Sequence, residues 1–253
     1  MAAERAGARA ITVHLREDRR HIQDRDLFRI RETIGIELNQ EMAPTPEMLE
    51  IAIALGPDEV CIVPERREEL TTEGGIDAAG LAQRLAPIIE RLREARIGVS
   101  LFVDPEPEQI EAAARLGANF VELHTGTYAN LADTDLAKVA NNKNGERRGG
   151  KPRPDNDVAA ALGGAARAEL ERLRAAAKLA RSLKLKPSAG HGLNYGNVAP
   201  ISAIPGIVWL HIGHSIVARS LMIGMERAVR EMDALINHKH AHRVAHRDGR
   251  GAR

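Results

Sequence analysis

Aromatic residues are scarce in this sequence, which has three Phe, two Tyr and one Trp among 253 residues. A core with so few rings has to depend on Ala, Ile, Leu and Val, and the chain offers no aromatic platform on which nucleic-acid bases could stack. The net charge is only +1, so non-specific attraction to nucleic acid is not expected either. We therefore expect no nucleic-acid partner.

Cysteine is almost absent as well, since Cys61 is the one cysteine and cannot form an internal disulfide. It lies in the apolar run 60–63, which favours a buried thiol over a nucleophile. No apolar stretch approaches the roughly 18 residues that span a bilayer. Residues 1–10 carry early charges and lack the apolar segment of a secretory signal. We therefore expect a cytoplasmic protein without membrane contact.

Short apolar runs alternate with longer segments of helical periodicity. In residues 78–96, for example, Leu81, Leu85, Ile88 and Leu92 recur at intervals of three and four. Nearly continuous apolar runs of strand length are typical of parallel strands covered on both faces. Seven such runs are present, at 11–15, 36–41, 59–64, 98–104, 120–125, 186–191 and 208–214. The alternation predicts the α/β class, with a parallel sheet that is either doubly wound or closed as a barrel.

Polar residues at the ends of several runs favour the barrel. These clusters lie at 14–16, 39–41, 122–125, 190–192 and 213–215. In a barrel all such strand ends open on one face, whereas a doubly wound sheet gathers reactive residues at one switch point. The chain has no Gly-x-Gly-x-x-Gly turn and no P-loop. The sequence therefore predicts one TIM (β/α)8 barrel domain over residues 1–237, with its first strand missing because only seven runs are found.

Two segments fall outside the alternation. Residues 141–156 are polar and contain Gly, Pro and many charges, which predicts a flexible insertion. Residues 238–253 form a basic tail that contains four of the ten histidines. Metal binding is one interpretation of this tail, but a disordered, solvated segment is the one we favour.

Several candidate acid–base residues lie at the ends of the first two runs. His14, Arg16 and His21 supply two titratable bases and a planar cation suited to phosphate or carboxylate, although this charge-rich stretch is also typical of a solvated loop. Glu41 ends the next run. A partly desolvated carboxylate on a barrel rim can have a raised pKa and act as a general base, and an ordinary ion pair is the alternative.

Two later residues favour a functional role more strongly. Glu122 alternates with Val121 and Leu123, so it points into the barrel if those two face the helices, and a carboxylate there needs a partner. His191 lies between Gly190 and Gly192, which allow backbone and ligand to approach closely.

Phosphate binding is suggested by two loops. Residues 71–75 combine Thr71 with paired glycines and could wrap a phosphate or form a hinged lid, with an ordinary loop as the alternative. Gly213 and His214 follow the last run and open the last helix, where barrels commonly bind phosphate.

Together these residues predict a barrel enzyme that acts on small phosphorylated metabolites by acid–base chemistry. A metal site is less favoured, because the histidines and glutamates are scattered and form no H-x-H or H-E-x-x-H pair. A phosphosugar isomerase or aldolase would need a Schiff-base lysine at a strand end, and Lys186 lies at the start of its run.

The sequence closely resembles the pyridoxine 5′-phosphate synthase family from about residue 6 to residue 232. The matching blocks are GARAITVHLREDRRHIQDRD, LNQEMAPTPEML, VPERREELTTEGG, VSLFVD, FVELHTGTYA, SAGHGLNY and IGHSIVARSL. The resemblance implies condensation of 1-deoxy-D-xylulose 5-phosphate with 3-amino-2-oxopropyl phosphate, without a metal or organic cofactor. It also implies a (β/α)8 barrel that assembles as a homo-octamer.

The resemblance further assigns roles to particular residues. His14 and Glu41 match the two catalytic bases of the family, His191 its proton donor, and Glu122 the glutamate that supports the transition state. The residues matched to substrate binding are Arg16, His21 and Thr71 for the deoxyxylulose phosphate, and Gly192, Gly213 and His214 for the amino-ketone phosphate.

One feature of the family has no counterpart in this sequence. Family members begin with a strand that carries an Asn and an Asp-His pair, followed by an Arg, and these residues also bind substrate. We therefore expect either a start upstream of Met1 or a damaged product with poor activity and solubility. The alternative function is a catalytically impaired barrel remnant that binds phosphate or a family partner.

Overall fold

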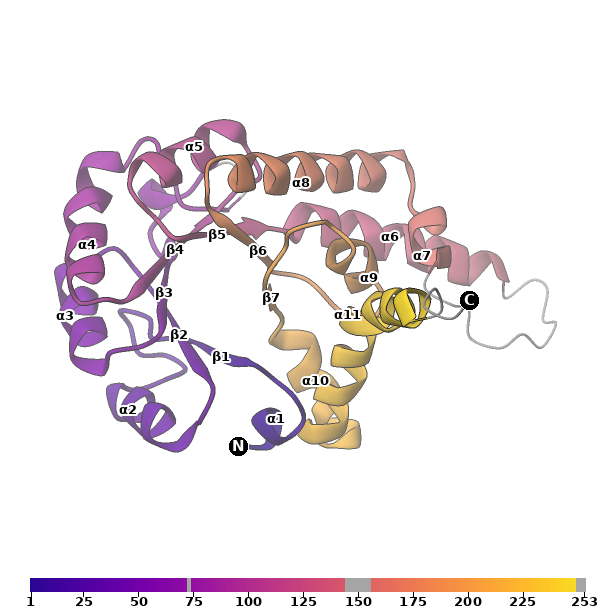
Figure 1. The fold of residues 1–253 in the computed structure, drawn as a ribbon, viewed down its shortest axis with the longest axis horizontal. Coiled ribbons are helices and arrows are strands. Elements are labelled where there is room, and N and C mark those ends of the chain that lie inside the picture. The colour runs from indigo at the N-terminus through magenta and orange to yellow at the C-terminus, as the bar shows by residue number, and fades with distance from the viewer. Residues whose placement is uncertain (72–73, 144–155, 249–253) are drawn as a thin grey trace.

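Seven parallel strands pair in chain order within the residues that the computed structural model describes, which are 1–71, 74–143 and 156–248. Figure 1 shows the strands as a curved arc with helices around its outer side. The strands are β1 (Ala10–His14), β2 (Glu37–Met42), β3 (Glu59–Ile62), β4 (Gly98–Val103), β5 (Phe120–His124), β6 (Lys186–Gly190) and β7 (Leu210–His211). This near-closed parallel barrel confirms the predicted fold class and excludes the doubly wound sheet.

Helices follow most of the strands. They are α1 (Ala2–Arg5), α2 (Asp24–Thr33), α3 (Pro46–Leu55), α4 (Ala82–Glu94), α5 (Pro107–Arg115), α6 (Gly126–Lys143), α7 (Asn156–Ala161), α8 (Gly164–Ser182), α9 (Val198–Ser202), α10 (His214–Ile223) and α11 (Met225–Asp248), with a 3-10 turn η1 (Arg67–Glu69). Local sequence sets their ends. In α3 the Thr45 hydroxyl accepts the Met48 N–H at 3.4 Å, Pro46 occupies the first turn, and Gly56 ends the helix at a φ of 60°.

The apolar core lies between the strands and the helices. Val121 and Leu123 of β5 belong to it together with Ile89 of α4 and Leu173 of α8, and all four are fully buried. Glu122, which alternates with the two β5 residues, contacts other strands inside the barrel instead. The predicted inward direction of this glutamate is therefore what the structure has, because successive strand side chains point to opposite faces.

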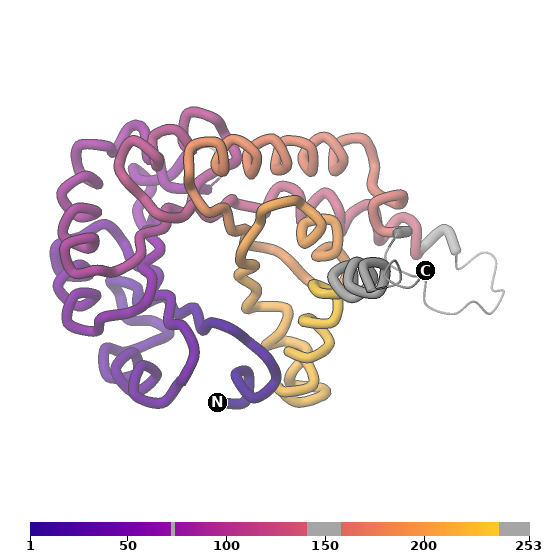
Figure 2. Tube along the Cα trace, in the orientation of Figure 1, coloured from indigo at the N-terminus to yellow at the C-terminus, as the bar shows by residue number. Residues whose placement is uncertain are grey.

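The sheet order ends at β1 on one side and β7 on the other, and two side-chain contacts join these ends. Thr12 Oγ1 of β1 lies 3.1 Å from His211 Nδ1 of β7. Arg5 of α1 pairs with Glu226 of α11 at 2.8 Å, and the tube in Figure 2 shows the two ends of the arc facing each other. The last strand has only the residues Leu210 and His211, far shorter than the predicted run, since its pairing with β6 covers only these positions.

The predicted insertion and tail are only partly visible. Helix α6 ends at Lys143 and α7 begins at Asn156, so most of segment 141–156 lies outside the described residues. The backbone of α11 continues to Asp248, and residues 249–253 lie outside the description. The flexible insertion and the disordered tail therefore remain predictions. In the described parts of the chain, no helix is both long and apolar enough to cross a membrane.

Candidate active site

The predicted acid–base residues lie at the carboxyl ends of the strands. His14 is the last residue of β1 and is paired in register with Glu41 of β2. His191 directly follows β6, and Gly213 and His214 follow β7. Because all the strands are parallel, these residues share one rim of the barrel.

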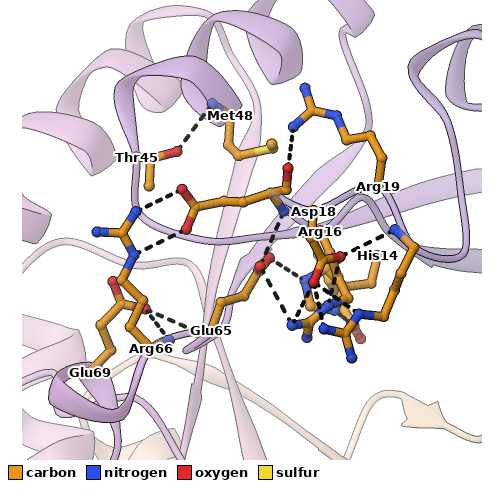
Figure 3. Close-up of polar contacts among 12 residues, drawn as sticks. His14, Arg16, Asp18, Arg19, Thr45, Met48, Glu65, Arg66 and Glu69 are labelled. Atoms are coloured by element: carbon orange, nitrogen blue, oxygen red, sulfur yellow. Dashed lines mark hydrogen bonds and ion pairs between the residues drawn. The ribbon is translucent and has the colours of Figure 1, made fainter.

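The imidazole of His14 lies between two carboxylates. Its Nε2 is 2.8 Å from Glu65 Oε1, a contact drawn in Figure 3, and its Nδ1 is 3.6 Å from Glu41 Oε2. Burial raises the pKa of Glu41, and the charge of Glu122 adds to this effect, while His14 and His211 oppose it. Glu41 is therefore a carboxylate that takes up a proton more readily than an exposed glutamate.

Glu122 lies inside the barrel with only 4% of the residue exposed. Burial raises its pKa to about 7, although the nearby Cys61 thiol, with Sγ 3.6 Å from Glu122 Oε2, lowers it. Its Oε2 also lies 3.8 Å from His211 Nε2. The thiol itself is fully buried, as the apolar run around Cys61 predicts.

His211 of β7 was not among the predicted site residues, although it lies within the run 208–214. Its ring is nearly buried, with Nδ1 against Thr12 Oγ1 and Nε2 facing the interior without a hydrogen-bond partner. Burial lowers its pKa, and the charge of Glu41 opposes this effect. The available signal was its position between Leu210 and Ile212, which places a polar side chain opposite two apolar ones.

His191 stands on the rim in a left-handed conformation. Its φ is 79° and that of Gly192 is 78°, so the chain turns sharply directly after β6. Its ring centroid lies 4.9 Å from that of His124 and 6.2 Å from that of Phe102. Partial burial lowers the pKa of His191, and the charge of His124 lowers it further. An imidazolium with a lowered pKa is a better proton donor.

His124 and Asp104 form a second buried pair that the sequence analysis did not single out, although His124 lies in the polar cluster at the end of β5. His124 Nδ1 is 3.1 Å from Asp104 Oδ1. Asp104 also accepts the Thr71 hydroxyl and, at 3.2 Å, the Gly75 N–H. Burial tends to raise the pKa of Asp104, but the hydrogen bonds from His124 and Thr71 outweigh it and hold the pKa low.

The predicted phosphate-binding residues are spread along the same rim. Arg16 points to Asp18 at 3.4 Å and to Glu65 at 4.0 Å, and His21 is exposed in the loop between β1 and α2. Thr71 is engaged by Asp104, as described above.

The glycine loops after β6 and β7 differ in their surroundings. A Cβ on Gly192 would lie 2.8 Å from the Cβ of Ala129, whereas one on Gly213 would meet nothing within 4 Å. Gly213 and His214 are exposed at the N-terminus of α10, which leaves room for an anion there.

A cavity of about 870 Å³ lies beside the loop that carries Thr71, outside the groups around His14. Its lining includes the acidic residues Asp77, Asp104, Glu106 and Glu108. Thr71 and Arg172 also line this cavity, so these carboxylates do not exclude a phosphate at its Thr71 end. Among the described residues, no group of three or more His, Cys, Asp or Glu could hold a metal ion.

Acid–base groups on one rim of a (β/α) barrel define the class of this protein as a barrel enzyme. The model of the family described as "Pyridoxal phosphate biosynthesis protein PdxJ" matches residues 1–238, and the chain belongs to this family. It is 50% identical over 236 residues to the pyridoxine 5′-phosphate synthase of Parasynechococcus marenigrum, covering 93% of this chain and 83% of the relative. It is 44% identical to that of Geobacter metallireducens, covering 93% and 87%.

Solved structures share the fold at much lower identity. Phosphoribosyl anthranilate isomerase from Thermus thermophilus superposes with a TM-score of 0.54 and 16% identity, covering 93% of this chain and 90% of that one. The 3-keto-L-gulonate-6-phosphate decarboxylase from Vibrio cholerae gives 0.56 and 12%, covering 91% and 86%. At these identities the likeness shows the barrel fold alone.

The comparisons correct one expectation of the sequence analysis. The predicted truncation is not borne out, since the family model matches from residue 1 and the relatives are covered over more than four fifths of their length. The alternative of an impaired barrel remnant is likewise not favoured, because the long matches are to synthases.

Proposed function

We propose that this chain is a pyridoxine 5′-phosphate synthase that joins 1-deoxy-D-xylulose 5-phosphate to 3-amino-2-oxopropyl phosphate. The products are pyridoxine 5′-phosphate, inorganic phosphate and water. The observation that carries the proposal is the placement of His14, Glu41 and His191 at one end of the barrel, with Glu122 beneath them in the interior. These groups lie in different environments, so they can exchange protons at different substrate carbons.

The reaction requires several separate proton transfers. The amine adds to the ketone and loses water to form an imine, after which tautomerisation, phosphate elimination and ring closure follow. One base cannot reach every carbon involved, so spaced acid–base groups are needed. We assign proton removal to His14 and Glu41 and proton delivery to His191. Glu122 supports the charge that develops deeper in the site.

The raised pKa of Glu41 supports its role as a base that also returns its proton. A carboxylate with an ordinary pKa would hold a proton too weakly at neutral pH to deliver it later in the cycle. The lowered pKa of His191 supports its role as a proton donor for the opposite reason, because its imidazolium gives up the proton more easily. The two directions differ because burial disfavours the charged form, which is the deprotonated form of Glu41 and the protonated form of His191, and the like charges of Glu122 and His124 add to these effects.

The phosphate groups of the two substrates would bind on opposite sides of these groups. We assign the deoxyxylulose phosphate to Arg16, His21 and Thr71, which lie in the loops after β1 and β3. We assign the amino-ketone phosphate to Gly192, which follows β6, and to Gly213 and His214 at the N-terminus of α10, where the helix favours an anion. No metal or organic cofactor takes part in this proposal.

We also propose that the enzyme acts in the cytoplasm as a homo-octamer. Helix α10 has no buried residue, and Val217, Leu221 and Met222 on it are 53%, 83% and 85% exposed. A second copy would cover this apolar surface. Light scattering coupled to gel filtration gives the assembly mass, and a monomer at micromolar concentration would exclude the octamer.

The decisive experiment is to incubate the purified chain with both phosphorylated substrates and to measure pyridoxine 5′-phosphate and inorganic phosphate. We expect equimolar formation of the two, and loss of at least about 100-fold in kcat for His14→Asn and for Glu41→Gln. Glu108→Gln, an exposed change outside the proposed groups, serves as the control. Turnover by both variants at the wild-type rate would contradict the assigned roles.

A further inference from the structure

We propose that Glu65 is a positioning residue for His14, which holds the imidazole as the tautomer with its proton on Nε2 and leaves the Nδ1 lone pair facing Glu41. The inference rests on the proposed function, which makes His14 a catalytic base. Glu65 would not touch the substrate in this role, because its carboxylate acts through the ring of His14.

The two sides of the His14 ring make unequal contacts. Nε2 lies 2.8 Å from Glu65 Oε1, which is hydrogen-bond distance, whereas Nδ1 lies 3.6 Å from Glu41 Oε2, which is longer than a hydrogen bond. An ionised carboxylate only accepts, so the Nε2 atom next to it has to carry the proton. A neutral imidazole then has its lone pair on Nδ1, and this nitrogen is the one able to take a proton.

Glu65 is itself held firmly, and its side chain is only 4% exposed. Its Oε2 accepts the Glu17 N–H at 3.1 Å, so the two carboxylate oxygens have different fixed partners. Its own N–H donates at 2.9 Å to Glu69 Oε2, and the fully buried Glu69 pairs with Arg84 at 2.8 Å. A carboxylate fixed at both oxygens and at its backbone can set the orientation of a ring, whereas a mobile one cannot.

A second contact joins the same two loops. Arg66 binds both carboxylate oxygens of Glu17, at 3.2 Å from Nε and 2.8 Å from Nη2. Figure 3 shows Arg66 beside the contact between Glu65 and His14, and the two contacts tie the loop after β3 to the end of β1 and to the loop that follows it. The bidentate pair fixes the distance between the loops that follow β1 and β3. Glu65, which follows β3, can therefore reach His14 at the end of β1.

The experiment measures the tautomer directly and then its effect on catalysis. Nitrogen-15 NMR of the full-length enzyme labelled at histidine, with His14→Asn used to assign the ring signals, is expected to show the proton of His14 on Nε2. In Glu65→Gln we expect a mixture of both tautomers, since an amide can donate as well as accept. A proton on Nδ1 of His14 in the wild-type enzyme would overturn the inference.

Kinetics of the same variants provide the second readout. We expect Glu65→Gln to lower kcat by about 100-fold and to move the acid limb of the kcat/KM profile to lower pH, because the protonated ring loses an adjacent negative charge. Glu65→Asp should recover part of the rate, and Glu68→Gln, an exposed change in the same loop, should behave as wild type. If Glu65 has only a structural role, Glu65→Gln will lower thermal stability without moving the acid limb. This result would overturn the inference.

The two proposals fail in different ways. If His14→Asn keeps full activity, His14 is not a catalytic base and its role in the proposed function is wrong. If His14→Asn is inactive while folded Glu65→Gln retains the wild-type kcat and pH profile, only the positioning role is wrong.

Discussion

The Glu122 carboxylate occupies space that is free only because residue 190 is glycine, since a Cβ on Gly190 would overlap Glu122 Oε1. The two residues lie on the neighbouring strands β5 and β6. We expect Gly190→Ala to push the carboxylate out of place, to lower kcat by at least about 10-fold and to cost about 1–3 kcal/mol of unfolding free energy through overpacking. Steady-state kinetics and urea unfolding of the purified variant measure both effects.

Gly164→Ala is the matched control for this change. A Cβ on Gly164 would meet nothing within 4 Å, and the residue begins α8, where alanine is favourable. We expect unchanged kcat and equal or slightly higher stability. Wild-type kinetics in Gly190→Ala would mean that the position of Glu122 does not matter for the reaction.

The pH dependence of stability should reveal two buried carboxyl groups. Burial raises the pKa of Glu122 to about 7, and burial together with the charges of Glu122 and Glu37 raises that of Glu59 to about 8. A group with a raised pKa stabilises the fold below its unfolded pKa, near 4.5, and this stabilisation is lost as the pH rises through the folded pKa. The wild-type enzyme should therefore lose stability between about pH 4.5 and pH 8.

Glutamine at either position should remove part of this loss. Relative to wild type, we expect Glu122→Gln to gain about 3 kcal/mol of unfolding free energy between pH 4.5 and pH 8, and Glu59→Gln to gain about 5 kcal/mol between pH 4.5 and pH 9. Only Glu122→Gln should lose activity, because Glu59 lies at the opposite, N-terminal end of its strand. Urea unfolding across pH 4–9 checks this, and parallel pH curves for wild type and both variants would contradict it.

The barrel could be predicted from sequence because its strands are nearly continuous apolar runs, a pattern that does not depend on distant contacts. The rim positions of His14, Glu41 and His191 followed from the same rule, since each residue ends or follows a run. The contact between the two ends of the sheet, β1 and β7, was not predictable. Side-chain contacts between β1 and β7, such as Thr12 with His211, depend on how far the sheet curves, which no local pattern records.

The partners within the site were also beyond sequence analysis. Glu65 lies 51 positions from His14, and Asp104 lies 20 positions from His124, so only the folded register brings each pair together. Residues 71–75 were predicted to wrap a phosphate or form a lid, with an ordinary loop as the alternative, but the buried position of Glu69 and its pairing with Arg84 cannot be inferred from composition. Long-range hydrogen bonds of this kind need the three-dimensional arrangement of the strands.

Asp104→Asn tests the network that joins Thr71 to His124. The low pKa of Asp104 means that its stabilisation is present above about pH 3.8 and is lost only as the pH falls below that value. We expect the variant to lose about 2 kcal/mol of unfolding free energy at pH 7 and much less near pH 3. KM for the deoxyxylulose phosphate should rise, because Thr71 and Gly75 bind different oxygens of Asp104 and asparagine keeps only one acceptor oxygen. Glu108→Gln is the control, and an unchanged KM would separate this network from substrate binding.

Because His124 lies against His191, replacing His124 should change the alkaline limb of the kcat profile. Partial burial and then the charge of His124 lower the pKa of His191, so an acid at this position loses its proton at a lower pH than an exposed histidine would. In His124→Asn the charge is gone, while the amide can still donate to Asp104. We expect the alkaline limb of the kcat profile to move to higher pH, since the His191 imidazolium becomes more stable. Thermal unfolding at each pH separates this shift from partial unfolding, and a limb that stays in place or moves to lower pH would exclude His191 as the group that it reports.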